Sequence, residues 1–226
     1  RIFHTDIQSV PDNNTIIFCA DVASLYPNIP IDRGVSMVRE FCLQMKLIEE
    51  EEELDFLMDL LLFILYKNYI IFDGKIYRQV KGTAMGTPVA VTFANLFLAS
   101  MEQPLLINRK EGILLYRRYI DDIFMISTNA TEASAFLEQF NGIISTIKLE
   151  SVTMDTRGIF LDLEIFLPPA TLNIWYRVFQ KAHNIYQYIP PFSQHPKAVF
   201  KAWVLEEAKR SLLKCSDRAD FLVLVE

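Results

Sequence analysis

A pair of adjacent aspartates between two apolar runs most constrains how this chain can fold. The runs, residues 112–116 and 123–127, are apolar and suited to strands, and Tyr119-Ile120-Asp121-Asp122 lies between them. This pattern predicts a β-hairpin with two carboxylates at its tip. Two adjacent negative charges are costly unless a cation neutralises them, and a hard divalent cation with oxygen ligands does so well. The alternative is a plain hairpin with an Asp-Asp turn.

Two segments upstream of this hairpin also have features of a functional site. Residues 15–20 are rich in β-branched and aromatic side chains, which predicts a buried strand that runs directly into Asp21. Functional side chains of α/β proteins often gather at such strand ends. The segment 81–88 contains Gly82 and Gly86, which allow the backbone to approach a ligand closely, and Pro88 opens an apolar helix. Clustered aspartates that hold two divalent ions are a general device for in-line nucleotidyl transfer.

At these residues the chain resembles the reverse transcriptase family. Residues 21–26 look like motif A, residues 82–88 like motif B and residues 119–122 like motif C, in the order and at the separations of that family's palm. A narrower resemblance, to the reverse transcriptases of Penelope-like retroelements, which are relatives of telomerase, rests on residues 21–30, 85–88, 160–162 and 187–190, with Ser193 and His195-Pro196.

The resemblance implies an α/β (α+β) fold: a polymerase palm with a split βαβ antiparallel sheet backed by helices, plus the start of a helical thumb. It implies a palm with motifs A to D over residues 1–170, and a primer-grip region with a thumb-entry helix over 171–226. The family's fingers should precede motif A, whereas about a dozen residues stand before the first strand here, and no GIY-YIG nuclease follows the last helix. We therefore expect a palm and thumb-entry fragment, or a truncated copy of such a retroelement.

The resemblance also assigns catalytic roles. Asp21 and Asp121 would hold two Mg²⁺ ions, for which Mn²⁺ can substitute, and Asp122 would assist as a further carboxylate. Lys148 matches the motif D lysine, a general acid for the leaving pyrophosphate. An ordinary surface lysine is the alternative for Lys148.

Substrate contacts follow from motifs A and B. Tyr26 matches the steric gate that crowds a ribose 2′-hydroxyl; the alternative is an aromatic core residue before a proline turn. The template and base pair would pass along the motif B loop, lined by Gly82, Gly86, Thr87 and Pro88, whose alternative role is an ordinary loop and helix start.

The formal charge of −6 is unusual for a protein that binds phosphate backbones. The charge is uneven, because the chain after Trp175 carries eight basic and five acidic residues. We therefore expect nucleic-acid contacts in this region, with a solvated helix face as the alternative. The candidates are Tyr176, Arg177, Gln180, Lys181, Lys201 and Arg210.

The periodicity predicts alternating helices and strands. Helices are expected over about 31–46, 53–68, 88–107, 131–146 and 196–214, with Thr131 as an N-cap. Besides the strand that ends at Asp21 and the Asp-Asp hairpin, strands are expected near 147–154, 159–166 and 171–179. A further hairpin, 69–72 with 75–79, should turn at Asp73-Gly74.

The cysteines and the apolar runs indicate the cellular compartment. Cys19, Cys42 and Cys215 lie far apart without metal-ligand spacing, which favours a reducing, intracellular compartment, nuclear or cytoplasmic. The apolar run 60–66 is too short to span a membrane, so no membrane partner is expected.

The function that these features favour is RNA-directed DNA polymerase, with an RNA template, a DNA primer and deoxynucleoside triphosphates as partners. Two alternatives stay open: a catalytically idle module that binds RNA or scaffolds a partner, and a palm polymerase that copies DNA. The oligomeric state is not indicated by the sequence.

Overall fold

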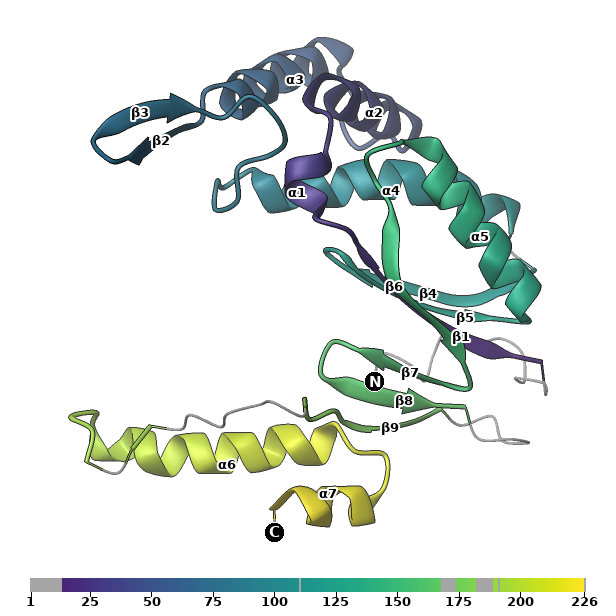
Figure 1. The fold of residues 1–226 in the computed structure, drawn as a ribbon, viewed down its shortest axis with the longest axis vertical. Coiled ribbons are helices and arrows are strands. Elements are labelled where there is room, and N and C mark those ends of the chain that lie inside the picture. Colours follow the sequence, from purple (N-terminus) through teal and green to yellow (C-terminus); the bar gives the residue numbers. More distant parts are fainter. Residues whose placement is uncertain (1–13, 110, 168–173, 182–188, 191, 226) are drawn as a thin grey trace.

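A four-stranded antiparallel sheet organises the molecule (Figure 1). The computed structural model describes residues 14–225 except residues 110, 168–173, 182–188 and 191. The sheet order is β4-β5-β1-β6. Its strands are β1 (Ile16–Val22), β4 (Ile113–Tyr119), β5 (Asp122–Ser127) and β6 (Leu149–Asp155). The Asp-Asp hairpin and the strand that ends beside Asp21 are thus confirmed, and they are neighbours in one sheet.

Strand β1 lies at the centre of the core and is buried on both faces. Phe18, Ala20 and Val22 belong to one hydrophobic cluster, whereas Ile17 and Cys19 belong to another. Because successive side chains of a strand point to opposite faces, Asp21 continues the face of Ile17 and Cys19.

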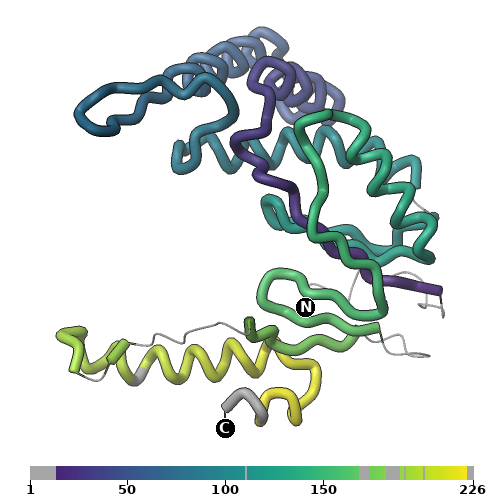
Figure 2. Tube along the Cα trace, in the orientation of Figure 1, coloured from purple at the N-terminus to yellow at the C-terminus, as the bar shows by residue number. Residues whose placement is uncertain are grey.

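Helices lie on the side of the sheet that carries Phe18 (Figures 1 and 2). They are the one-turn α1 (Leu25–Asn28), α2 (Ile31–Gln44), α3 (Glu51–Tyr66), α4 (Ala90–Asn108) and α5 (Ala130–Ile143). Of these, α3 packs on α2 at the outside of this layer. The one-turn helix α1 was not predicted. The cap of α5 also differs from expectation: Thr131 lies inside the helix, and the Asn129 side chain accepts the Glu132 N–H at 3.0 Å.

Helix α4 is long and apolar enough to cross a membrane by length and composition. In this molecule its residues Phe93, Phe97, Leu98 and Met101 are fully or almost fully buried in the core. The same apolar pattern is therefore explained by a central core helix.

A second, three-stranded antiparallel sheet lies against the other face of the first. Its strands are β7 (Arg157–Phe160), β8 (Leu163–Phe166) and β9 (Trp175–Val178). The single strand expected over 159–166 is wrong, because Phe160 pairs with Leu163 across a two-residue turn and Leu161 adopts a φ of 57°. Strand β9 pairs with β8, so the expected boundary between residues 170 and 171 divides one sheet.

The chain continues into α6 (Lys197–Leu213), which was predicted, and α7 (Arg218–Val225), which was not. The other predicted hairpin is confirmed as β2 (Tyr69–Phe72) and β3 (Lys75–Arg78). Asp73 and Gly74 both adopt positive φ, 50° and 69°, as a tight two-residue hairpin turn requires. This hairpin projects away from the body of the molecule (Figure 1).

Candidate active site

Carboxylates from three neighbouring strands meet at one end of the main sheet. Asp21 of β1 lies directly opposite Asp122 of β5 on one side and Glu150 of β6 on the other. Asp121 occupies the hairpin turn, and its carbonyl accepts the Val22 N–H at 3.0 Å. Like charges directly opposite in a sheet are destabilising, so this arrangement costs stability in the absence of a cation. Glu150 was missed from the sequence, because nothing there indicates which strand pairs with β1.

The backbone around these carboxylates is irregular on both sides. The pairing of β1 with β6 shifts register between Cys19 and Asp21, and Ser151 adopts a φ of 51° at this bulge. In the Asp-Asp turn Ile120 adopts a φ of 56°, a conformation that a β-branched residue rarely takes. Such strain persists only where the surrounding structure imposes it, and it is often found at functional sites.

The clustered charges perturb one another. Burial raises the pKa of Asp21, and the neighbouring Asp121, Asp122 and Glu150 raise it further. Burial and the charge of Asp121 also raise the pKa of Asp122, whereas Lys181 opposes this shift. Both carboxyls therefore give up their protons less readily than usual.

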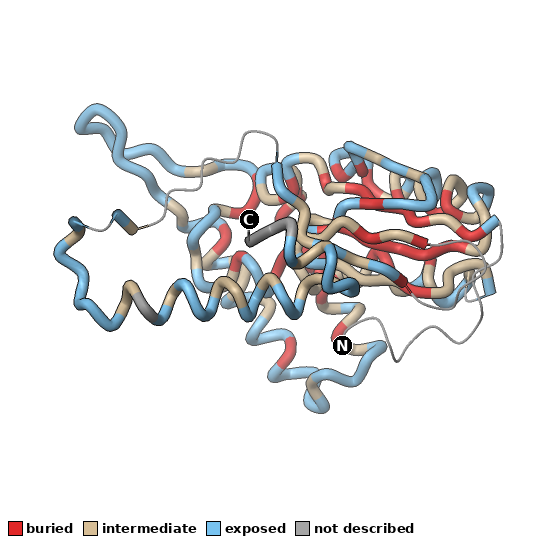
Figure 3. The backbone as a smooth tube through the Cα atoms, turned by 90° about the horizontal axis from the view of Figure 1, so that it is seen from below, coloured by how far each residue is buried: buried red, intermediate tan, exposed pale blue. Residues whose placement is uncertain are grey.

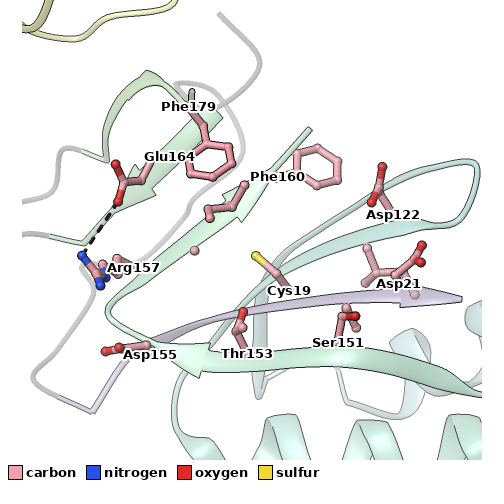
Figure 4. Close-up of a pocket in the computed structure, with 14 residues that line it drawn as sticks. Cys19, Asp21, Asp122, Ser151, Thr153, Asp155, Arg157, Phe160, Glu164 and Phe179 are labelled. Carbon is pink, nitrogen blue, oxygen red and sulfur yellow. Dashed lines mark ion pairs between the residues drawn. The ribbon is translucent and has the colours of Figure 1, made fainter. Parts of the chain in front are cut away.

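Asp21 and Asp122 line one end of a cavity of about 580 Å³ between the two sheets. Figure 4 shows the two side chains near each other, with Cys19 further along β1 and the Arg157–Glu164 ion pair, 3.9 Å long, at the far end. The apolar lining includes Phe160 and Phe179. The carboxylates thus reach a space that is open to a ligand.

The donor set fits hard divalent cations in part. Among the residues that the structure describes, no three His, Cys, Asp or Glu side chains are grouped so as to hold a metal by themselves. A polymerase-type Mg²⁺ site does not require this, because one or two carboxylates usually act together with water and substrate phosphates. Asp21, Asp121 and Asp122 supply the oxygen donors and the negative charge, so they fit such an ion.

A buried arginine holds the Asp-Asp turn from behind. Arg118 Nε donates to Glu102 Oε1 of α4 at 2.6 Å, and the two side chains are only 10% and 6% exposed. Its other nitrogens donate to Asn95 Oδ1 and Asn95 O, at 2.7 and 3.0 Å, and to Ile120 O at 3.0 Å. This network, which sequence reasoning missed, connects α4 to the strained residue of the turn.

Tyr26 and the motif B loop lie beside the carboxylates. The pKa of Tyr26 is raised by burial and by the charge of Asp121, which places its ring in the field of the site. The Thr83 N–H donates to Tyr26 O at 2.8 Å. Gly82 has a φ of 70°, and a Cβ there would lie 2.5 Å from Pro27 Cα, so this glycine is required for packing within the chain.

The rest of that loop is more open. Gly86 has a φ of 87°, nothing surrounds the position of a Cβ, and both it and Pro88 are exposed. Thr87 Oγ1 donates to Ala84 O at 3.1 Å, which closes the turn before α4. A role of Gly86, Thr87 and Pro88 in lining a template path stays a prediction.

Lys148 does not point toward Asp21 or Asp122 in this structure. Its ammonium contacts the Asn141 carbonyl near the end of α5, while its own carbonyl accepts the Ala23 N–H at 2.9 Å. The main chain of Lys148 is therefore next to motif A, and a general-acid role would need a different side-chain rotamer.

The C-terminal candidates have different surroundings. Arg177 is paired with Glu164 at 2.7 Å and stacks on Phe166, and Arg210 is paired with Glu207 at 2.6 Å. Tyr176 is partly buried and packs against the smaller hydrophobic cluster that contains Ile17 and Cys19. Gln180 and Lys181 are exposed, and Lys181 is close enough to influence Asp122. The side chain of Lys201 lies outside the described part of the structure, as do residues 187 and 188 of the narrower resemblance.

No protein-family model matches the sequence, and no curated protein matches it. Solved structures do match. Telomerase from Candida albicans, in complex with the TWJ fragment of telomeric RNA, aligns with a TM-score of 0.64 and 10% identity over 92% of this chain and 37% of that chain.

Apo telomerase from Candida tropicalis gives a TM-score of 0.55 at 13% identity over 74% of this chain and 33% of that chain. A form of it truncated from the C-terminal domain gives 0.54 at 12% identity, over 71% and 35%. The chain thus spans about a third of the length of these telomerases. The likeness establishes the fold, a mixed helical and antiparallel arrangement similar to telomerase, and confirms the fold class expected from the sequence.

Proposed function

We propose that this chain is the palm of an RNA-directed DNA polymerase, a reverse transcriptase of the Penelope-like kind, acting inside the cell in the nucleus or cytoplasm. The observation that carries the proposal is the placement of Asp21, Asp121 and Asp122 at one sheet end in a fold similar to telomerase. Burial and, after it, repulsion by neighbouring carboxylates raise the pKa of Asp21 and Asp122, and divalent cations would relieve the repulsion.

In this proposal Asp21 and Asp121 bind two Mg²⁺ or Mn²⁺ ions, and Asp122 supplies further negative charge. When bound, the ions would activate the primer 3′-hydroxyl and neutralise the charge on the leaving pyrophosphate. The residues of the chain position the reactants. Tyr26, beside Asp121, would crowd a ribose 2′-hydroxyl and so favour deoxynucleotides. The buried Arg118 fixes the turn that carries Asp121 and Asp122.

Primer extension tests the proposal. A labelled DNA primer annealed to an RNA template is incubated with deoxynucleoside triphosphates and Mg²⁺ or Mn²⁺, using this chain and any longer natural protein that contains it. We expect metal-dependent extension that Asp121→Asn abolishes, because the substitution removes a metal ligand. Asp59→Asn, an exposed change on α3, should leave extension unchanged and serves as the matched control.

The alternative is a module that binds RNA without catalysis. It would be supported if the longer protein binds the hybrid tightly yet extends no primer with either metal. Equal extension by the parent and by Asp121→Asn would show that these carboxylates are not the catalytic ligands. Extension on DNA templates alone would favour a DNA-copying palm polymerase.

A further inference from the structure

The β2–β3 hairpin has no hydrophobic core of its own. All eight strand residues are exposed, and the pair forms a separate two-stranded sheet. Figure 3 shows the exposed projecting hairpin in contrast to the buried central strands. An isolated two-stranded hairpin is at best marginally stable in water. A ligand that binds to the exposed side chains of this hairpin would therefore also stabilise it.

The charge of the hairpin is opposite to that of the whole chain. Residues 67–81 contain four basic residues, Lys67, Lys75, Arg78 and Lys81, and one acidic residue, Asp73, in a protein of net charge −6. Within the described residues, none of these four cations pairs with a carboxylate, whereas Arg177, Lys209 and Arg210 of the C-terminal region all do. The hairpin cations therefore remain available to an anionic partner.

Two of these cations lie directly across the hairpin from aromatic side chains. In the antiparallel register Tyr69 is directly opposite Arg78, and Phe72 is directly opposite Lys75. Cross-strand partners share a face of the ribbon, so each face presents a ring beside a cation. Tyr69 and Phe72 are 55% and 70% exposed, and Tyr77 is 46% exposed on the face of Phe72. Proteins bind single-stranded nucleic acid with this combination, because bases stack on rings while cations contact phosphates.

The hairpin is also connected directly to the candidate active site. Strand β3 leads through Gln79, Val80 and Lys81 into Gly82, which packs on Pro27 next to Tyr26. Gln79 contributes to a rigid connection, because its N–H donates to Asn68 O at 3.0 Å and its side chain to Lys81 O at 2.8 Å. A ligand bound to the hairpin would thus be only a few residues along the chain from the loop beside the carboxylates.

We infer that the β2–β3 hairpin is a docking surface for single-stranded RNA, which in the proposed function is the unpaired part of the template. The naming of the RNA as template depends on that function; the binding itself does not. The rings of Phe72, Tyr77 and Tyr69 stack on bases, and Lys75 and Arg78 contact phosphates. The surface is sequence-tolerant, since every base offers a face for stacking.

The test measures the affinity of the 226-residue chain for a short fluorescent oligouridylate over a range of salt concentrations. Lys75→Gln/Arg78→Gln should flatten the dependence of log affinity on log salt by about 1.4, since a single strand contributes about 0.7 for each phosphate contact. The control Lys46→Gln/Arg218→Gln removes the same charge from exposed sites outside the hairpin and should keep the parent slope.

The aromatic variant separates stacking from charge. Phe72→Ala/Tyr77→Ala should weaken binding at least about fivefold for each ring, with the salt slope unchanged. Photocrosslinking of a 4-thiouridine oligonucleotide to the parent chain should map to residues 69–78. Because the side chains are exposed, all variants should unfold at the parent temperature, which circular dichroism checks.

Unchanged affinity and slope in both hairpin variants would overturn the inference. So would RNA binding that is unaffected while Phe72→Ala/Tyr77→Ala converts a dimer to a monomer, because the surface would then join copies of this chain. The proposed function fails separately: hairpin-dependent RNA binding without any primer extension leaves the inference intact. Conversely, if primers are extended but neither hairpin variant changes the affinity for RNA, the proposed function stands and the inference about the hairpin fails.

Discussion

At the scale of single residues, the end of β1 places like charges in register. Asp21 is flanked by Asp122 and Glu150 on adjacent strands, and its pKa is raised by burial and by these neighbours. Two residues along the same strand, burial is also the largest cause of the raised pKa of the Cys19 thiol. The charge of Asp122 raises that pKa further, whereas hydrogen bonds with Thr153 and Ile159 lower it. Burial is thus the largest cause at both positions, and repulsion between carboxylates adds to it at Asp21.

Cys19 gives a pH-dependent prediction. Burial raises the pKa of its thiol to about 12, from 9.0 for an exposed thiol. The native thiol therefore keeps its proton where the unfolded chain has lost it, so its contribution to stability is complete below pH 9 and declines between pH 9 and 12. We expect the denaturation midpoint of the parent to fall over that range, and that of Cys19→Ala to fall less.

A thiol reagent at pH 8 provides an independent check. Only Cys215, which is partly exposed, should react rapidly in the native chain, whereas Cys19 and Cys42 are buried. All three should react after unfolding. Rapid native labelling of Cys19 would show that the strand is not covered as described.

At the scale of elements, local chemistry explains what the sequence could predict. The Asp73-Gly74 turn, strand β1 and the Asp-Asp hairpin follow from turn residues and apolar runs, and all three are confirmed. Arg118 could not be recognised, because its partners Glu102 and Asn95 belong to a helix whose packing on β4 is a tertiary property. Glu150 was missed for the same reason, and the turn at Leu161 because it lacks glycine or asparagine.

The Arg118–Glu102 pair gives an element-scale prediction. Arg118→Met should lower the free energy of unfolding by about 3–5 kcal/mol, because it leaves Glu102 buried without its partner. Adding Glu102→Leu should recover much of this loss, as measured by denaturant unfolding. The double variant should still extend primers poorly, because the Ile120 carbonyl loses its Arg118 donor and the turn its support.

That result separates positioning from stability. If the double variant regains both stability and the extension rate of the parent, Arg118 contributes only to packing. If the single variant is as stable as the parent, the buried pair is not formed in solution.

At the scale of the whole molecule, two layers lie on opposite faces of one sheet and leave its carboxylate end accessible. Helices cover one face, and β7–β8–β9 cover the other (Figure 1). The cavity between the sheets leads to Asp21 and Asp122. The fold class could be predicted, because the motifs follow the order of a palm. Which basic residues are free to bind nucleic acid could not be predicted, because the pairing of Arg177 and Arg210 with acidic side chains depends on the folded structure.

The central claim, that Asp21, Asp121 and Asp122 form a divalent-cation site, is tested most directly by thermal unfolding with increasing Mn²⁺. At ten times the dissociation constant, binding should stabilise the native chain by about 1.4 kcal/mol, which corresponds to an increase of roughly 3–5 °C for a chain of this size. Asp21→Asn and Asp121→Asn should each lose most of this increase, and without metal neither should be less stable than the parent, because each relieves repulsion. Asp59→Asn should retain the full increase. An unfolding temperature of the parent that does not respond to Mn²⁺, or an equal increase in all three variants, would contradict the account.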